Sequence, residues 1–139
     1  MLIHAPDLLG LDTEIVGVVS EHADAYALSV EQGRVVCTDS AQTFADGLAC
    51  RQPQPDALAI IAQGAARVIR VSDHDIAHAI RLYHETTHNT AEGAGAAALA
   101  GLIKEQAQQQ GRRVAVVLSG ANIDRQLYAT LLDEDLASL

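Results

Sequence analysis

Residues 112–124 read RRVAVVLSGANID, and this stretch decides the fold that the sequence predicts. Its centre, Val114–Leu118, is an unbroken apolar run rich in β-branched residues, and it stops at the turn residues Ser119 to Asn122. Such a run is typical of a strand buried on both faces inside a parallel sheet. Ligands bind at the carboxyl ends of these strands, so we expect the Ser119 hydroxyl to face a crevice. Gly120 would let the backbone turn away sharply.

Two further apolar runs, Glu14–Val19 and Arg67–Val71, also predict strands. A helix is expected between them over about Glu21–Gln32, with Ser20 as its N-cap, and a second over Asp56–Gln63. Each connection between successive strands is long enough to carry a crossover helix. The predicted fold class is therefore α/β, a three-layer αβα arrangement with a mainly parallel sheet, in a single domain over residues 1–139.

The second half of the chain carries two capping-box signatures. Ser72 with Asp75 predicts a helix through about His88. Asn89 with Glu92 repeats the signature and predicts a helix that runs to Gln110. A last helix is expected from about Asp124.

Three strands make a narrow parallel sheet, because such sheets are normally wider and covered on both faces. An edge strand as apolar as AVVL would invite pairing with another chain. We therefore predict either self-association into a homo-oligomer or a complementing chain that supplies more strands.

Composition limits the classes of function. The chain has 139 residues, 49% of them hydrophobic, and a formal net charge of −9, which disfavours nucleic acid and anionic lipid as partners. The amino-terminal sequence lacks the features of a leader, and no segment approaches the ~20 apolar residues of a membrane span, so we expect a cytoplasmic protein. Cys37 and Cys50 lack CxxC spacing, which favours reduced structural thiols over a disulfide or a metal site.

Four histidines form two i,i+4 pairs, His74/His78 and His84/His88, a spacing that can chelate zinc. Helical periodicity instead places His74, His78 and His88 on a polar face together with Arg81 and Glu85. The opposite stripe is apolar and consists of Ile76, Ala79, Ile80 and Tyr83. A solvated polar face is favoured over opportunistic metal binding.

Four motifs follow one another along the chain: TFADGLA at Thr43–Ala49, RVSDHDI at Arg70–Ile76, EGAGAA at Glu92–Ala97 and VLSGANID at Val117–Asp124. In this order and approximate spacing they resemble threonine dehydratases and related serine/threonine ammonia-lyases. The resemblance is to the C-terminal portion of their pyridoxal-phosphate (PLP) domain, of the tryptophan-synthase-β-like fold. It implies that the chain is a partial PLP-enzyme domain.

The resemblance also implies a set of cofactor contacts. The family's S-G-G-N serine hydrogen-bonds the pyridine nitrogen of PLP, and its counterpart is Ser119 in a turn that reads S-G-A-N. The implied cofactor-binding residues are Ser119, Gly120, Asn122, Glu92, Gly93 and Gly47. Taken without the family, the residues favour structural roles: Ser119 as an N-cap or turn residue, and Glu92 as a member of the capping box with Asn89.

Other parts of the family's site have no counterpart in the sequence. Family members hold PLP through a lysine and grip its phosphate with a glycine-rich loop. Lys104 is the only lysine here, on the polar end of a predicted helix, and no GGGG-like run occurs. The divalent-cation positions of some relatives correspond to Val19 and Ala25. We therefore expect no catalytic residue, no metal site and no PLP binding by this chain alone.

Three functions remain open. The first is a stand-alone relic of an ammonia-lyase domain that is catalytically incompetent and has no assigned role. The second is one part of a split threonine/serine ammonia-lyase, whose complementing chain supplies the lysine and the phosphate loop. The third is a module that binds a small anion or an amino acid at the helix N-termini near Asn89 and Asn122.

Overall fold

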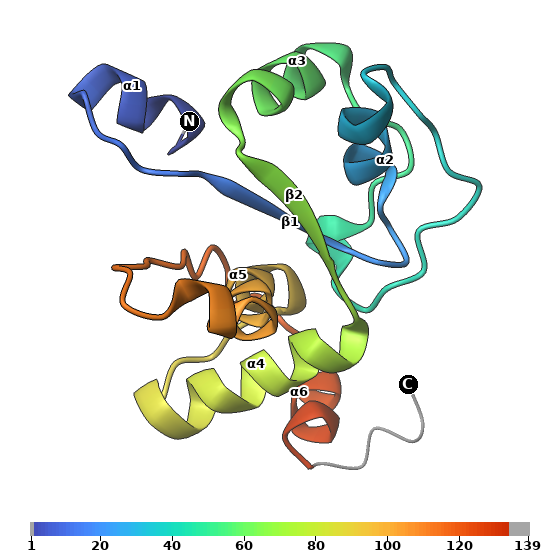
Figure 1. The fold of residues 1–139 in the computed structure, drawn as a ribbon. Coiled ribbons are helices and arrows are strands. Elements are labelled where there is room, and N and C mark those ends of the chain that lie inside the picture. The colour runs from blue at the N-terminus through green and yellow to red at the C-terminus, as the bar shows by residue number, and fades with distance from the viewer. Residues whose placement is uncertain (1, 134–139) are drawn as a thin grey trace.

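A computed structural model, which describes residues 2–133, shows a chain folded around a two-stranded parallel sheet (Figure 1). Strand β1 (Val16–Ser20) pairs with β2 (Arg67–Val71) in a register that runs from Val16 opposite Arg67 to Ser20 opposite Val71. Both strands were predicted from their apolar runs, β2 with the same bounds. The crossover between them carries helices, as parallel pairing requires.

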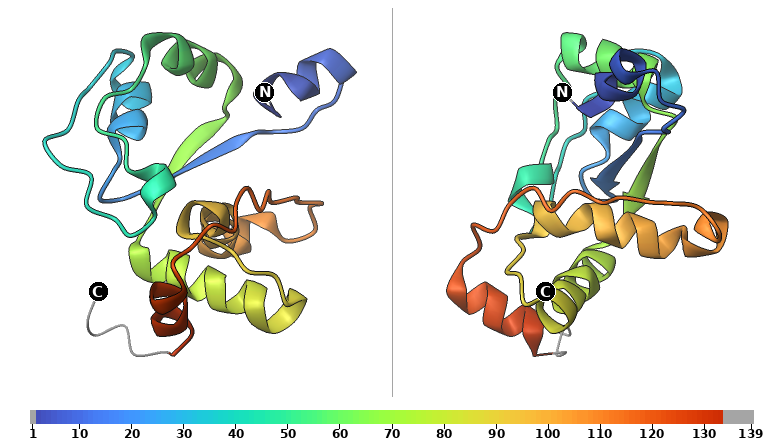
Figure 2. Two further views of the ribbon diagram at one scale, coloured as in Figure 1. Left: turned by 180° about the vertical axis from the view of Figure 1, so that it is seen from behind. Right: turned by 90° about the vertical axis from the view of Figure 1, so that its left-hand side faces the viewer.

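Helices cover both faces of the sheet, which confirms the predicted αβα layering (Figures 1 and 2). Helices α2 (Ala25–Gln32) and α3 (Pro55–Gly64) lie on one side. Helix α5 (Gly93–Lys104) packs on the other face, and α4 (Asp73–Thr87) lies against α5. The remaining elements are η1 (Leu2–His4), α1 (Ala5–Leu9), η2 (Asp46–Leu48), η3 (Gln106–Gln109) and α6 (Arg125–Leu132). None of the helices in residues 2–133 is both long and apolar enough to cross a membrane.

The predicted strand at Val114–Leu118 is wrong for this chain. These residues belong to no strand, and Val114 and Val117 are 47% and 49% exposed. The segment runs beside α5 and is not hydrogen-bonded to the sheet (Figure 2). A β-strand needs a neighbouring backbone to pair with, and within residues 2–133 no such neighbour reaches this segment.

Two helix starts also differ from the prediction. Helix α2 begins at Ala25 after Asp24, because Ser20 is the buried last residue of β1 rather than an N-cap. The capping box of Asn89 with Glu92 does not form, since α5 begins only at Gly93 with Glu92 as its N-cap residue. That helix ends at Lys104 and not at Gln110, and a 3₁₀ turn follows it.

Helix α4 matches its prediction most closely. The capping box of Ser72 with Asp75 is present, and the apolar stripe Ile76, Ala79, Ile80 and Tyr83 is buried. Burial opposes ionisation of the Asp75 carboxyl, but hydrogen bonds to Ser72 outweigh it and lower the pKa of Asp75. The four paired histidines are exposed, as expected. Arg81 is a correction, because it is buried and its Nη1 donates to the carbonyl oxygen of Leu131 at 2.9 Å.

The main core lies between α4, α5 and α6, where Ile76, Ile80 and Leu131 are fully buried. Small residues on α5 bring this helix close to the sheet: a Cβ at Gly101 would lie 2.9 Å from side-chain atoms of Val18 and Ile69. The last helix starts near Asp124, as predicted, and Asp124 caps it by accepting hydrogen bonds from the backbone N–H groups of Gln126 and Leu127.

An ion pair joins the sheet to the carboxyl end of α5. The Arg67 guanidinium donates through Nε and Nη2 to the two carboxylate oxygens of Glu105, whose side chain is 14% exposed. These hydrogen bonds lower the pKa of Glu105 below its ordinary value of 4.5. A carboxylate with a lowered folded pKa stabilises the fold above its unfolded pKa, and this contribution is lost as the pH falls through the folded value.

We expect Glu105→Gln to flatten the acid side of the stability profile. The free energy of unfolding, measured by urea denaturation from pH 7 to about pH 3, should fall less in the variant because the Arg67 pair no longer titrates. Glu85→Gln, which removes an exposed carboxylate on α4, is the matched control. An unchanged profile for Glu105→Gln would contradict the assignment.

Candidate functional site

Three segments that are distant in sequence converge at the amino end of α5: residues 43–47, 92–95 and 119–122. Glycines allow the approach. A Cβ at Gly93 would lie 2.8 Å from the Cα of Ala45 and 3.0 Å from the ring of Phe44. A Cβ at Gly47 would lie 2.7 Å from the Cβ of Ala94. Backbone from the loop therefore rests directly on the first turn of α5.

The turn after Val114–Leu118 also contacts the amino end of α5. The N–H of Glu92 donates to the carbonyl oxygen of Gly120 at 3.1 Å. A Cβ at Gly95 would clash with that carbonyl, and a Cβ at Gly120 would clash with the Glu92 carboxylate. The Glu92 side chain thus lies over Gly120 instead of capping α5, although its negative charge at the amino end of the helix is favourable.

Four of the six predicted site residues are brought together here, namely Gly47, Glu92, Gly93 and Gly120. Ser119 and Asn122 flank Gly120 along the chain and are exposed. The hydroxyl of Ser119 is therefore accessible at the edge of the cluster and does not face a closed crevice in this chain. We call residues 45–47, 92–95 and 119–122 the convergence site.

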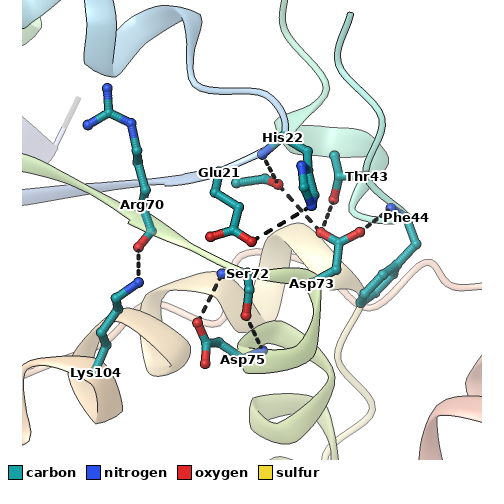
Figure 3. Close-up of polar contacts among 10 residues, drawn as sticks. Glu21, His22, Thr43, Phe44, Arg70, Ser72, Asp73, Asp75 and Lys104 are labelled. Atoms are coloured by element: carbon teal, nitrogen blue, oxygen red, sulfur yellow. Dashed lines mark hydrogen bonds and ion pairs between the residues drawn. The ribbon is translucent and has the colours of Figure 1, made fainter. Parts of the chain in front are cut away.

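A second polar cluster lies at the carboxyl ends of β1 and β2 (Figure 3). Asp73 is its centre. The Thr43 hydroxyl donates to its Oδ1 at 2.5 Å, the Phe44 N–H to its Oδ2 at 3.2 Å, and the Ser20 hydroxyl to Oδ1 at 3.4 Å. One carboxylate thus joins the end of β1, the start of α4 and the loop at residues 43–44.

Thr43 links Asp73 to the convergence site. Thr43 Oγ1 accepts a hydrogen bond from the N–H of Ala45 at 3.1 Å, and Ala45 is fully buried against Gly93. Asp73 therefore positions the loop that ends at Gly47. Sequence reasoning missed this role: the available signal was an acidic residue two positions after a parallel strand, but its partners in the loop lie about 30 residues away in sequence.

Lys104 is remote from the convergence site. Its Nζ donates to the carbonyl oxygen of Arg70 at 2.8 Å, at the carboxyl end of α5 (Figure 3). Glu92 stands at the other end of the same helix, and at 1.5 Å per residue the two ends are about 18 Å apart. The guanidinium of neighbouring Arg70 binds Glu31 and Asp24, and these contacts raise the pKa of Arg70.

Comparison with known proteins identifies the class. Residues 3–120 match the family described as Pyridoxal-phosphate dependent enzyme, and the chain belongs to this family. The convergence site is therefore a portion of a PLP-enzyme domain.

Individual relatives show how much of such an enzyme this chain covers. L-threonine ammonia-lyase of Thermotoga maritima is 28% identical over 90% of this chain, and the match covers 31% of the relative. Phenylserine dehydratase of Ralstonia pickettii is 32% identical over 90% of this chain and 39% of its own length. The crystal structure of a T.th. threonine deaminase superposes with a TM-score of 0.82 at 29% identity, covering 88% of this chain and 45% of that one. The chain thus spans 31% to 45% of the length of these relatives.

Maize serine racemase shares the fold, with a TM-score of 0.83 at 22% identity over 95% of this chain and 42% of the racemase. The predicted tryptophan-synthase-β-like PLP fold is therefore confirmed as a part of that fold.

We expect Asp73→Ala to release the loop at residues 43–47. Loss of three hydrogen bonds to one carboxylate should lower the free energy of unfolding by about 1–3 kcal/mol and speed hydrogen exchange at the Phe44 amide. Asp73→Asn keeps one acceptor oxygen, so both the stability and the protection of the Phe44 amide should lie between those of Asp73→Ala and of the unmodified chain. Asp39→Ala, at an exposed position in the preceding loop, is the control. A Phe44 amide that exchanges equally fast in Asp73→Ala and the unmodified chain would refute the positioning role.

Proposed function

We propose that this chain is a stand-alone relic of a PLP-dependent ammonia-lyase domain for hydroxy amino acids and is catalytically incompetent by itself. The relatives' names support the substrate class, since threonine, phenylserine and 3-hydroxyaspartate are all β-hydroxy amino acids. The observation that carries the proposal is the position of Lys104, about 18 Å along α5 from the convergence site.

The residues of the convergence site fit only part of the cofactor. Ser119 offers an exposed hydroxyl, which can donate to a ring nitrogen, beside a wall of glycine backbone that a flat ring can approach closely. Holding PLP also requires a lysine and a set of phosphate-binding N–H groups. The only lysine in the sequence lies elsewhere, so the residues do not fit the complete cofactor and no catalytic step follows from them.

A second candidate is one part of a split threonine/serine ammonia-lyase. The exposure of Val114 and Val117 favours it, because an apolar segment that precedes the site in sequence lacks a neighbouring strand within the described residues. In that case the complementing chain would supply the lysine and the phosphate loop, and Ser119 would contact the cofactor ring.

The third function predicted from sequence is a module that binds a small anion or an amino acid at two helix N-termini. The structure does not favour the first of these two sites, near Asn89. Helix α5 starts at Gly93 and not near Asn89, and the Glu92 carboxylate occupies its amino end. A carboxylate there competes with an incoming anion for the same partial positive charge.

We expect PLP to form no specific adduct with this chain. After incubation with PLP and borohydride reduction, peptide mass spectrometry should find Lys104 modified no more in the folded chain than in urea, because nothing near it in the described structure holds the cofactor. Lys104→Arg is the matched control for background labelling. A stoichiometric adduct on Lys104 that requires the folded state would overturn the proposal.

A further inference from the structure

Two pairs of histidines with the same spacing belong to the region of α4, and the structure makes them different. His74 and His78 both lie inside the helix, which spans Asp73–Thr87, whereas His88 lies beyond its end as the C-cap residue. The backbone of His88 is left-handed, with φ 56°, so its Cβ does not point in the direction that a helical residue would give it. Only the first pair therefore stands as two successive residues of one helical row.

The second pair is also engaged by other groups. Nδ1 of His84 lies 3.3 Å from the hydroxyl of Tyr128, and Nδ1 of His88 lies 3.1 Å from the carbonyl oxygen of His84. Within residues 2–133, the imidazoles of His74 and His78 make neither a hydrogen bond nor an ion pair. Both ring nitrogens of each remain open to a ligand.

The imidazoles of His74 and His78 project from one exposed face of α4. Residues four apart on a helix stand one turn from each other, with their Cβ atoms about 5–6 Å apart. Both side chains are exposed, because the opposite face of the helix carries the buried Ile76 and Ile80. Helix α4 lies on the far side of α5 from the sheet (Figure 1). Two neutral imidazoles at this spacing can bind one metal ion together.

The charge at the start of α4 suits a cation. The partial positive charge of a helix N-terminus opposes one, but the first turn holds the carboxylates of Asp73 and Asp75 and the chain carries a net charge of −9. Asp73 is bound by Thr43 and Asp75 by Ser72, so these carboxylates act through their charge and not as ligands. No group of three or more His, Cys, Asp or Glu side chains in residues 2–133 could hold a metal ion, so water has to complete the coordination.

We propose that His74 and His78 together bind one late first-row divalent cation, Zn²⁺, Ni²⁺ or Cu²⁺. Imidazole nitrogen suits these cations, whereas Mg²⁺ prefers oxygen ligands. The ion joins the first two turns of α4, the helix whose first residue, Asp73, positions the loop at residues 43–47. The inference is independent of the proposed function, because neither histidine belongs to the convergence site.

Zinc titration of the untagged 139-residue chain, followed by NMR of the imidazole resonances, tests the proposal. We expect the His74 and His78 signals to shift together and to saturate at one ion per chain, while the same concentration of Mg²⁺ moves neither. His78→Gln should weaken zinc binding at His74 by at least about tenfold, because a chelate becomes a single ligand. His88→Gln, at the equivalent position of the second pair, should leave zinc binding at His74 within about twofold.

The histidine signals also separate this site from the free thiols of Cys37 and Cys50, which bind zinc in their own right. Far-UV circular dichroism of both variants controls for folding, since both replaced histidines are exposed. Zinc should slow amide hydrogen exchange in the first two turns of α4 in the unmodified chain and not in His78→Gln. Unchanged His74 and His78 signals in excess zinc would overturn the inference, as would equal effects of the two variants or signals of His84 and His88 that move first.

Discussion

Backbone hydrogen bonding between parallel strands is the constraint on which this structure depends. Each strand presents N–H and C=O groups on both sides, and those groups require partners wherever the strand is buried. The chain supplies one such pair, β1 with β2, and the α-helices pack around it. Val114–Leu118 has the composition of a third strand, yet it has no backbone neighbour within residues 2–133, so it stays extended and partly exposed beside α5. Next to it lies a groove lined by β1, α5 and Val114–Val117.

Features fixed by neighbouring residues were predictable from sequence. The bounds of β2, the capping box of Ser72 with Asp75, and the start of α6 near Asp124 each depend on a few consecutive side chains. The apolar stripe of α4 follows from helical periodicity in the same way.

Features that depend on distant segments were not predictable. The sequence predicts Glu92 as a capping residue, but in the structure its carboxylate lies against Gly120. The sequence also predicts Arg81 on a solvated face, but in the structure it donates to the carbonyl oxygen of Leu131 on α6. Asp73 holds a loop about 30 residues earlier in the chain, which no local pattern reveals. The Val114–Leu118 prediction failed for a related reason, since composition indicates a strand but cannot supply its partner.

The convergence site also depends on segments that are distant in sequence. Its glycines allow three backbone segments to meet at the amino end of α5, and Asp73 fixes one of them. Ser119 is exposed beside these segments. The chain belongs to the family of PLP-dependent enzymes, and its Lys104 lies at the opposite end of α5 from these glycines.

Amide hydrogen exchange of the isolated chain tests the central claim, that Val114–Leu118 lacks a strand partner within this chain. Amides of Val19 and Ile69, which face the partner strand, should be protected, while those of Val114, Val116 and Val117 should exchange near the unprotected rate. Protection of residues 114–118 equal to that of β2 would show that the chain completes its own sheet, and it would contradict this account.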